Sequence, residues 1–395
     1  MKIAISGCGV AGPTLAYWLT RAGHDPVLIE EAPQLRTGGY IIDFWGIGYD
    51  IVDKMGLVPR LKDCGYQVGE VRFVDEHGRR SSGFSTDVFR RLTKDRFTSL
   101  RRSDLSATLC STVENKVETI FGDSIVAIED NGEAVHVSFQ HAASRKFDLV
   151  IGADGLHSRV RRLAFGPQER FEVQFGYRVA AFEAKGYRPR DELIYLSHSR
   201  PGRQISRFSM RDDRTLFLFL FRDEQLKEPV PLTDAGYKTA LRQVFADDRW
   251  ECPDILAAME GTEGLYFDRV SQIRMQAWAK GRSALVGDAA ACVSLLAGEG
   301  TGLAIVEAYV LAGELRRAEG DYKAAFTAYQ KRLMPFLLRK QEVAKKFASI
   351  FAPRTSIGIA FRNLVMHLMA IPFVADGVVA RDLRDDIELP DYDWR

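Results

Sequence analysis

The chain has 395 residues, of which 46% are hydrophobic and 27% charged; this composition is typical of a folded globular protein and excludes a disordered or fibrous one. Lys and Arg number 54 against 53 Asp and Glu, so the net charge of +1 provides no field that would attract nucleic acid. The length favours two compact units or one large α/β unit with an insertion, and the partner we expect is a small molecule.

Cysteines and apolar stretches indicate the compartment. The five cysteines are scattered and never spaced as CxxC, so they predict neither a disulfide framework nor a metal site and favour a reducing cytoplasm. We expect the apolar start of the chain to be retained as structure, because it lacks a convincing cleavage site. The apolar stretch 357–380 contains Arg362 and Asp376 and is too polar for a spanning helix, so we predict contact with a membrane surface at most and no stable insertion.

The first 30 residues predict a strand, a tight turn, a helix and a second strand. An apolar run at 2–6 is followed by Gly7, Gly9 and Gly12 in the pattern GxGxxG, and then by helical spacing of apolar residues. The second apolar run ends at Glu30, 18 positions after Gly12, close to the roughly 20 positions typical of dinucleotide sites. A glycine-rich turn without a ligand is the alternative, but strand, helix and acid together favour a Rossmann-like dinucleotide site.

The predicted turn suits a pyrophosphate. Free N–H groups and the helix dipole favour negative charge at a helix N-terminus, and a side chain at Gly9 would block the approach. Glu30 is expected to accept hydrogen bonds from the adenosine ribose, and its charge disfavours a 2′-phosphate, so the nucleotide is FAD or NAD rather than NADP. Ala11, Pro13 and Glu31 complete the cofactor contacts expected here.

The middle of the chain predicts another strand and then an inserted sheet. Residues 147–153 read as a buried strand that runs into Asp154 and Gly155 and then into a helix start. Between 165 and 273 the pattern changes to short alternating or apolar runs separated by Pro, Gly and charged residues. This pattern predicts an antiparallel sheet.

The last third predicts a strand end and long helices. An apolar run ends at Gly287 and Asp288, and glycines at 298, 300 and 302 follow. Helices are predicted at 300–318, 321–346 and 357–367, with Pro335 as a candidate kink inside the second.

Three motifs in this order resemble the class A flavoprotein monooxygenases, the family of aromatic hydroxylases. They are the GxGxxG turn, the DGxxSxxR pattern that begins at Asp154, and the Gly287-Asp288 pair with the glycine-rich helix start behind it. The resemblance implies an α/β fold with a Rossmann-like FAD-binding domain of the GR2, PHBH-like type, an inserted antiparallel-sheet substrate domain and C-terminal helices. The boundaries expected are 1–165 with 274–330 for the FAD-binding domain, 166–273 for the substrate domain and 331–395 for the C-terminal helices.

The resemblance also favours FAD over NAD as the bound nucleotide, and it implies which residues contact the flavin. Asp288 is expected to accept a hydrogen bond from a ribityl hydroxyl. N–H groups at a helix N-terminus can face O2 and N1 of the flavin and stabilise the charge of the reduced ring. The N–H groups concerned are those of Gly300, Thr301, Gly302 and Leu303. The alternative for Asp288 is a helix-capping residue.

Other cofactor residues follow from the same resemblance. Arg102 aligns with an arginine that contacts the flavin in relatives, and 36–43 resembles a mobile loop with an arginine near NADPH and an aspartate near the flavin. Solvated surface charges are the alternative for these positions. The residues implied are Arg36, Gly39, Asp43, Arg102, Asp154, Gly155, Gly287 and Gly298.

Within the family, the tetracycline-inactivating monooxygenases are the most similar. The segments AGPTLAYWL, GGYIID, GDAAACVSLLAGEGTGLA and LAGELRRAEGD all resemble theirs. The chain departs from common hydroxylases at the flavin edge, with Glu299 for the usual Gln and Gly302 for the usual Asn, and with Ala291, Ser294 and Leu295 after the GDAA segment.

The function implied is an FAD-dependent monooxygenase. NADPH or NADH would dock transiently and reduce FAD, and a flavin hydroperoxide formed with O2 would hydroxylate a small, polycyclic aromatic substrate, so we assign no catalytic side chain. An FAD-linked reductase or dehydrogenase on the same fold is the alternative enzyme, and a non-catalytic flavin-binding protein is the alternative of another class. We expect a monomer or weak dimer.

An apolar stripe near the C-terminus suggests a cover for the pocket. We predict that it lines the pocket entrance, with packing on the FAD-binding domain as the alternative. The stripe comprises Phe347, Phe351, Ile357, Phe361, Leu364 and Leu368.

Overall fold

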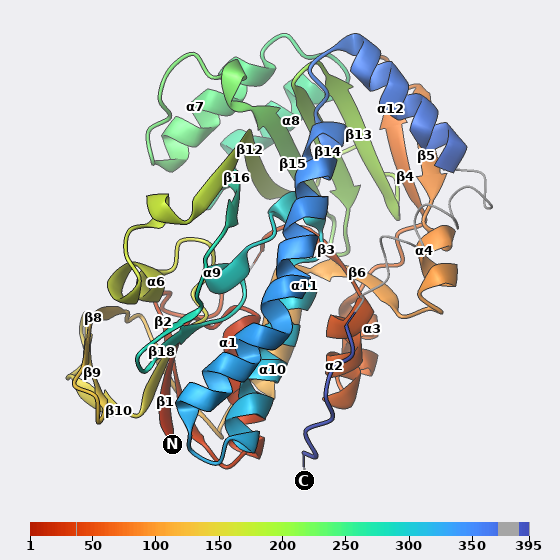
Figure 1. Ribbon diagram of the computed structural model, residues 1–395. Coiled ribbons are helices and arrows are strands. Elements are labelled where there is room, and N and C mark those ends of the chain that lie inside the picture. Colours follow the sequence, from red (N-terminus) through yellow and green to blue (C-terminus); the bar gives the residue numbers. More distant parts are fainter. Residues whose placement is uncertain (37, 370–386, 395) are drawn as a thin grey trace.

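The computed structural model describes residues 1–36, 38–369 and 387–394, apart from the side chains at 346–351 and 369. Figure 1 shows a parallel sheet with its helices at one end of the molecule and a large second sheet at the other, with helix α11 (Tyr322–Phe351) running along both. Among the described residues, no helix is long and apolar enough to cross a membrane.

The first sheet carries the predicted dinucleotide fold. Its central strand β1 (Lys2–Ser6) pairs in parallel with β2 (Asp25–Glu30) and β11 (Leu149–Gly152), because these short runs are apolar on both faces and helices cover them. Helix α1 (Ala11–Arg21) packs between this sheet and α10 (Gly300–Arg317). The other strands, in the sheet order β17-β18-β11-β1-β2-β7, are β17 (Ala279–Lys280), β18 (Ser283–Leu285) and β7 (Glu118–Phe121).

The second sheet is the predicted insertion, enlarged by strands from earlier in the chain. Its order is β16-β12-β15-β14-β13-β4-β5, and β4 and β5 precede residue 166. The sheet is antiparallel except where β13 pairs in parallel with β4. The α/β fold class is confirmed, and the domain boundaries at 165, 273 and 330 stay a prediction. The strands are β4 (Glu70–Val74), β5 (Arg80–Ser85), β12 (Glu172–Lys185), β13 (Ile194–Arg200), β14 (Arg203–Ser209), β15 (Arg214–Arg222) and β16 (Tyr266–Ile273).

Leucine and phenylalanine alternate along β15, so the two residue types lie on opposite faces of the second sheet. The phenylalanines at 217, 219 and 221 pack under α7 (Asp234–Phe245) and α8 (Cys252–Glu260). The leucines at 216, 218 and 220 point to the opposite face, where their neighbours include Ile41 and Ala352. The leucine face therefore looks toward the FAD-binding fold, and any substrate cavity lies between the two.

A two-stranded sheet joins the layers. β3 (Ile41–Trp45) pairs antiparallel with β6 (Phe97–Arg101), and α5 (Arg102–Ser111) begins directly after β6. The remaining elements are α2 (Gly46–Lys54), α3 (Val58–Cys64), α4 (Asp87–Leu92), β8 (Ile125–Asp130), β9 (Val135–Phe139), β10 (Arg145–Phe147), α6 (Arg159–Ala164), η1 (Gln168–Arg170), η2 (Asp223–Gln225), α9 (Asp288–Ala291) and η3 (Leu295–Ala297).

The three predicted C-terminal helices are present. α11 continues to Phe351 with Pro335 inside it, and the last helix is α12 (Ser356–Met369). Arg362 of α12 donates to Ser199 and Gln204, so this helix lies on the same sheet face as the leucines. The four stripe residues on α12 do not pack on any described part of the FAD-binding domain, because Ile357, Phe361, Leu364 and Leu368 are 82%, 67%, 55% and 45% exposed. Phe347 and Phe351 belong to the same prediction, and their side chains lie outside the described part.

Candidate functional site

The three glycines of the first turn have different physical roles. A Cβ at Gly7 would lie 2.5 Å from the Ala153 carbonyl oxygen, and one at Gly12 would lie 1.9 Å from the Gly7 carbonyl oxygen. These two positions therefore serve the close packing of the turn. A Cβ at Gly9 would meet nothing nearer than the Arg102 guanidinium at 3.7 Å. Gly9 thus faces open space, as the approach of a cofactor requires.

Backbone donors remain available at this turn. Glu30 accepts the Cys8 N–H at 2.8 Å and the Ala32 N–H at 3.0 Å, which fixes the acid beside the turn. Among the hydrogen bonds of the described residues, none uses the N–H groups of Gly9, Val10 or Ala11. Pro13 follows in the first helical turn, where its missing N–H costs nothing. An open cradle with free N–H groups at a helix N-terminus fits the pyrophosphate of FAD.

The predicted residues Glu31, Asp154 and Gly155 lie around the start of α6. Glu31 forms an ion pair with Arg159 at 2.9 Å. Asp154 accepts the Arg159 N–H at 2.8 Å and the Val160 N–H at 3.1 Å, so it holds the start of α6. Burial raises the pKa of Asp154, although these hydrogen bonds oppose the shift. Gly155 has a φ of 76° in the turn between them. Direct contact of Asp154 with the cofactor stays a prediction.

Arg102 and Asp288, which come from segments distant in the chain, lie near each other. The Arg102 N–H donates to the Tyr40 carbonyl oxygen at 3.2 Å, and the rings of Tyr40 and Tyr266 lie 5.8 Å apart. Burial alone would lower the pKa of Arg102, but Tyr40 and Asp288 raise it on balance. The Arg102 side chain is nevertheless solvent-accessible.

The Gly287-Asp288 turn stands beside the N-terminus of α10. Gly287 has a φ of 64°, and the Asp288 Oδ1 lies 3.6 Å from the position of a Cβ at Gly300. The Leu303 N–H donates to the Glu299 carbonyl oxygen at 3.1 Å inside the helix. The donors left for a ligand are therefore the N–H groups of Gly300, Thr301 and Gly302, which no hydrogen bond of the described residues uses.

Asp43 lines a cavity next to the same helix start. The Ser99 hydroxyl donates to the Asp43 carboxylate, and burial raises the pKa of Asp43 more than this hydrogen bond lowers it. Gly298 has a φ of 69° in the loop before α10. The cavity is lined by Asp43, Phe44, Trp45, Ile47, Gly48, Gly298, Glu299, Gly302, Leu303, Val306 and Phe336.

The loop before β3 lies at the rim. Arg36 and Gly39 are exposed, and Thr37 between them lies outside the described residues. A Cβ at Gly38 would lie 4.0 Å from the Glu183 carboxylate of β12, so the loop borders the second sheet. Of the predicted residues, Asp43, Gly298, Gly302 and Leu303 line the cavity at the start of α10, whereas Arg36 is exposed.

The wall opposite the FAD-binding fold is aromatic. Tyr66 packs edge-on against Phe208 with ring centroids 5.5 Å apart, and Tyr195 stacks on Phe208 at 5.8 Å. Met210 is buried in the same cluster. Tyr66, Phe208 and Met210 are 5%, 0% and 1% exposed, so these side chains mainly pack against one another.

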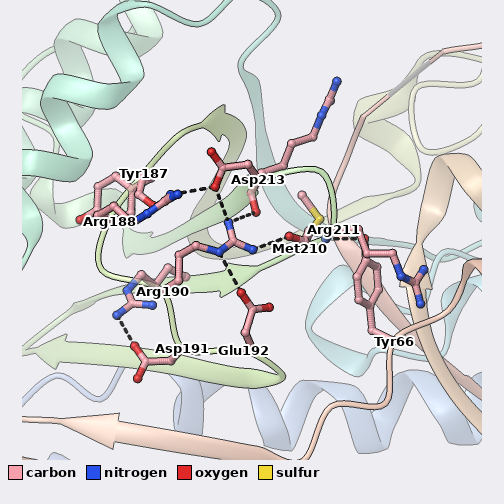
Figure 2. A network of polar contacts seen from close by, with 11 residues as sticks. Tyr66, Tyr187, Arg188, Arg190, Asp191, Glu192, Met210, Arg211 and Asp213 are labelled. Atoms are coloured by element: carbon pink, nitrogen blue, oxygen red, sulfur yellow. Dashed lines mark hydrogen bonds and ion pairs between the residues drawn. The ribbon is translucent and has the colours of Figure 1, made fainter.

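A network of polar contacts holds the hairpin next to this aromatic cluster (Figure 2). Arg190 donates to Glu192 at 2.8 Å and to the Met210 carbonyl oxygen at 2.6 Å, and Asp213 pairs with Arg188 at 2.7 Å. The Arg211 guanidinium lies 4.6 Å from the Tyr66 ring centroid and donates to the Cys64 carbonyl oxygen at 2.9 Å. Carboxylates pair with Arg188 and Arg190, so the network holds the hairpin that carries Met210.

Three residues of the site were not predicted from the sequence. Tyr40 and Tyr266 face Arg102, and burial raises the pKa of Tyr40 to about 12. Glu307 is 1% exposed and accepts the Gly287 N–H at 2.8 Å. A signal for Glu307 was present, because it is an acid inside the apolar run 303–313.

Comparisons with known proteins agree with this geometry. The family model described as FAD binding domain matches residues 1–324. A flavin-dependent monooxygenase of Legionella longbeachae is 36% identical over 386 residues, covering 96% of this chain and 97% of that protein. The solved tetracycline destructase Tet(51) matches with a TM-score of 0.84 at 31% identity over 99% of each chain. HpxO of Klebsiella pneumoniae, solved with FAD and uric acid, matches with a TM-score of 0.78 at 20% identity over 97% of this chain and 96% of that one, which shows a shared fold alone.

Proposed function

The chain belongs to the FAD binding domain family and is an FAD-dependent monooxygenase that acts on a small molecule with O2, and from this premise we propose a more specific function. We propose that it uses NADPH or NADH to hydroxylate a polycyclic aromatic substrate of the tetracycline kind. Oxygen transfer through a flavin hydroperoxide belongs to this proposal, as do a cytoplasmic location and a monomer or weak dimer.

One observation carries the proposal: groups from three segments distant in sequence lie close to one another. Gly9 faces open space at the first turn, and Arg102 reaches toward it from α5. Asp288 stands next to the free N–H groups at the start of α10 and is near enough to Arg102 to raise the pKa of its guanidinium. An extended dinucleotide with a flavin ring would need such groups along its length.

The chain's own groups bind and polarise the cofactor. FAD, when bound, supplies the redox and oxygen-activating chemistry. The N–H groups at Gly9 and Ala11 would hold the pyrophosphate, and those at Gly300 and Gly302 would stabilise negative charge on the reduced ring. Asp288 would accept from the ribityl chain, while Arg102 offsets its charge.

The aromatic wall supports the substrate class. Tyr66 and Phe208 of this aromatic cluster are 5% and 0% exposed, and Tyr195 is partly exposed, so a fused-ring molecule would stack on Tyr195. Tetracycline is the first probe, because Tet(51) is called a tetracycline destructase.

One nucleotide-binding sheet suggests how the reductant is handled. The described residues form a single mainly parallel sheet with a glycine-rich turn, and that turn suits FAD. NADPH or NADH would then dock transiently rather than on a domain of its own.

The test is oxygen uptake by the FAD-loaded protein with NADPH or NADH, with and without tetracycline. We expect tetracycline to accelerate NAD(P)H oxidation, with O2 consumed and a product one oxygen atom heavier. Nucleotide oxidation without O2 uptake would favour a reductase, and a yellow protein that oxidises neither nucleotide under any condition would favour a binding protein. If uptake proceeds only with aromatics other than tetracyclines, the substrate class is wrong while the enzyme class stands.

A further inference from the structure

A buried carboxyl group lies directly behind the flavin-facing turn. Glu307 of α10 is 1% exposed, and its Oε2 accepts the Gly287 N–H at 2.8 Å. The Tyr329 hydroxyl of α11, fully buried, lies 3.1 Å from the same oxygen and 3.1 Å from the Leu285 carbonyl oxygen. The acid therefore joins α10 and α11 to the turn that presents Asp288.

The backbone of the Gly287-Asp288 turn is tightly packed between neighbouring helices. A Cβ at Gly287 would lie 3.2 Å from the Ala304 Cβ and 3.3 Å from the Ala11 Cβ, so the backbone is pressed between α1 and α10. A buried N–H without an acceptor costs about 1–3 kcal/mol. Glu307 is the acceptor that satisfies the Gly287 N–H, and it thereby sets the direction in which Asp288 leaves the turn.

A proton on this acid satisfies all the hydrogen-bond contacts around it. The single hydroxyl proton of Tyr329 cannot serve Leu285 and Glu307 together. If Tyr329 donates to the Leu285 carbonyl oxygen, its own oxygen must accept, and the partner available is a proton on Glu307 Oε2. A hydroxyl oxygen at Glu307 can donate to Tyr329 and still accept from Gly287, so one neutral acid satisfies every contact.

The surroundings contain no charge that would favour ionisation. The groups that face Glu307 are Tyr329 from α11, the Gly287 N–H, and the negative Asp288 from α9. In the described part of the chain, no Lys or Arg side chain forms a hydrogen bond or ion pair with Glu307. Burial, which outweighs the two hydrogen bonds, raises the pKa of Glu307 well above its usual range.

We propose that Glu307 is a neutral carboxylic acid and the positioning residue of the Gly287-Asp288 turn, holding Asp288 toward the flavin end of FAD. The inference rests on FAD binding at this turn. A neutral acid orients the turn without adding negative charge where the charge of the reduced flavin develops. An ionised group would oppose that charge in a medium of low dielectric constant.

The experiment compares Glu307→Gln, Glu307→Leu and a matched pair at Glu314. Glu314 lies on the same helix, is 6% exposed and accepts the Tyr392 hydroxyl at 2.7 Å, but it also pairs with Arg332 at 3.3 Å. It is a buried acid remote from the turn. Thermal unfolding of each apoprotein and FAD titration at a temperature where all variants are folded separate stability from positioning.

We expect Glu307→Gln to bind FAD within about threefold of the wild type, because the amide oxygen still accepts the Gly287 N–H without charge. Glu307→Leu leaves this N–H unsatisfied and should weaken FAD binding roughly ten- to hundredfold. Glu314→Leu should lower the unfolding temperature and leave FAD affinity unchanged. Infrared spectroscopy should show the C=O band of a protonated carboxyl group that disappears in Glu307→Gln and persists in Glu314→Gln.

Several results would overturn the inference. If the infrared band does not change in Glu307→Gln, the acid is ionised. If Glu307→Gln loses as much affinity as Glu307→Leu, an uncharged acceptor at this position does not hold the turn. If Glu307→Leu unfolds more easily but binds FAD as the wild type does, Glu307 is structural only. Wild-type protein that takes up no FAD would contradict the cofactor assignment itself, and the inference would fall with it.

Discussion

Replacement of Gly9 by valine separates cofactor binding from folding. In the structure, a side chain at this position points into open space and meets only the flexible end of Arg102, 3.7 Å away. We therefore expect the apoprotein to keep its stability within about 0.5 kcal/mol, as for a surface substitution. FAD binding should be lost, because the new side chain occupies the path of the pyrophosphate to the helix N-terminus.

The size of the loss follows from the donors concerned. A hydrogen bond to a charged group contributes about 1.5–3 kcal/mol. Blocking the N–H groups of Gly9 and Ala11 would then cost about 3–6 kcal/mol, or roughly a hundred- to ten-thousandfold in affinity. Gly12→Ala is the contrasting variant, since its Cβ would lie 1.9 Å from a backbone carbonyl oxygen and must destabilise the apoprotein.

The assay pairs denaturant unfolding of the apoproteins with fluorescence titration of FAD. The expected pattern is a stable Gly9→Val that stays colourless and a destabilised Gly12→Ala. A folded Gly9→Val that retains stoichiometric FAD would show that the cofactor does not approach this turn, and the site described above would be wrong.

Other predictions address the flavin end, the C-terminal tail and pH. Asp288→Ala and Arg102→Ala should each slow flavin reduction or weaken FAD binding by roughly one to two decades while ADP binding stays near wild type; wild-type stopped-flow kinetics in both would refute the assignment. Tyr392→Ala should lower the free energy of unfolding by about 3–5 kcal/mol in denaturant titrations, because this ring fills the space beside Gly313. A hydrogen bond to Asp268 raises the pKa of His157, so the pair stabilises the fold at low pH and the gain is lost as pH rises through the folded-state pKa. The pair is partly exposed, so we expect less than about 1 kcal/mol, and Asp268→Asn should abolish this pH dependence of unfolding.

The C-terminal tail around Tyr392 is buried, and this affects how the proposed role of α12 as a cover over the pocket should be tested. Truncation after Ala352 removes α12 but also Tyr392, which is 3% exposed in the core of the FAD-binding domain. Loss of coupling in that variant would reflect instability as well as an open pocket. Arg362→Leu is the sharper variant, since it releases α12 from Ser199 and Gln204 and leaves the tail in place.

Local patterns were sufficient to predict the dinucleotide fold. The spacing of Gly7, Gly9, Gly12 and Glu30 defines a strand, a turn and a helix whose geometry is set within one short segment. Helix starts and ends were predicted within a few residues for the same reason. The sequence did not separate the roles of the glycines, because the clash at Gly12 and the open space at Gly9 depend on how the turn closes.

Features that depend on distant segments were not predicted. β4 and β5 join the second sheet through a parallel contact with β13, and no local pattern specifies a partner so far along the chain. The use of the Leu303 N–H inside α10 and the contact between Glu307 and Gly287 also arise only when separate elements meet. The four stripe residues of α12 were correctly predicted to lie on one face of a helix. Their periodicity does not reveal that this face points to solvent.

The central claim, FAD-dependent monooxygenation, is tested most directly with oxygen-18. The FAD-loaded protein is supplied with NADPH or NADH, tetracycline and ¹⁸O₂ in ordinary water, and the product is analysed by mass spectrometry. The account predicts that one ¹⁸O atom enters each product molecule and that Gly9→Val forms none. Product whose new oxygen comes from water, or substrate that is changed without any oxygen gained, would contradict it.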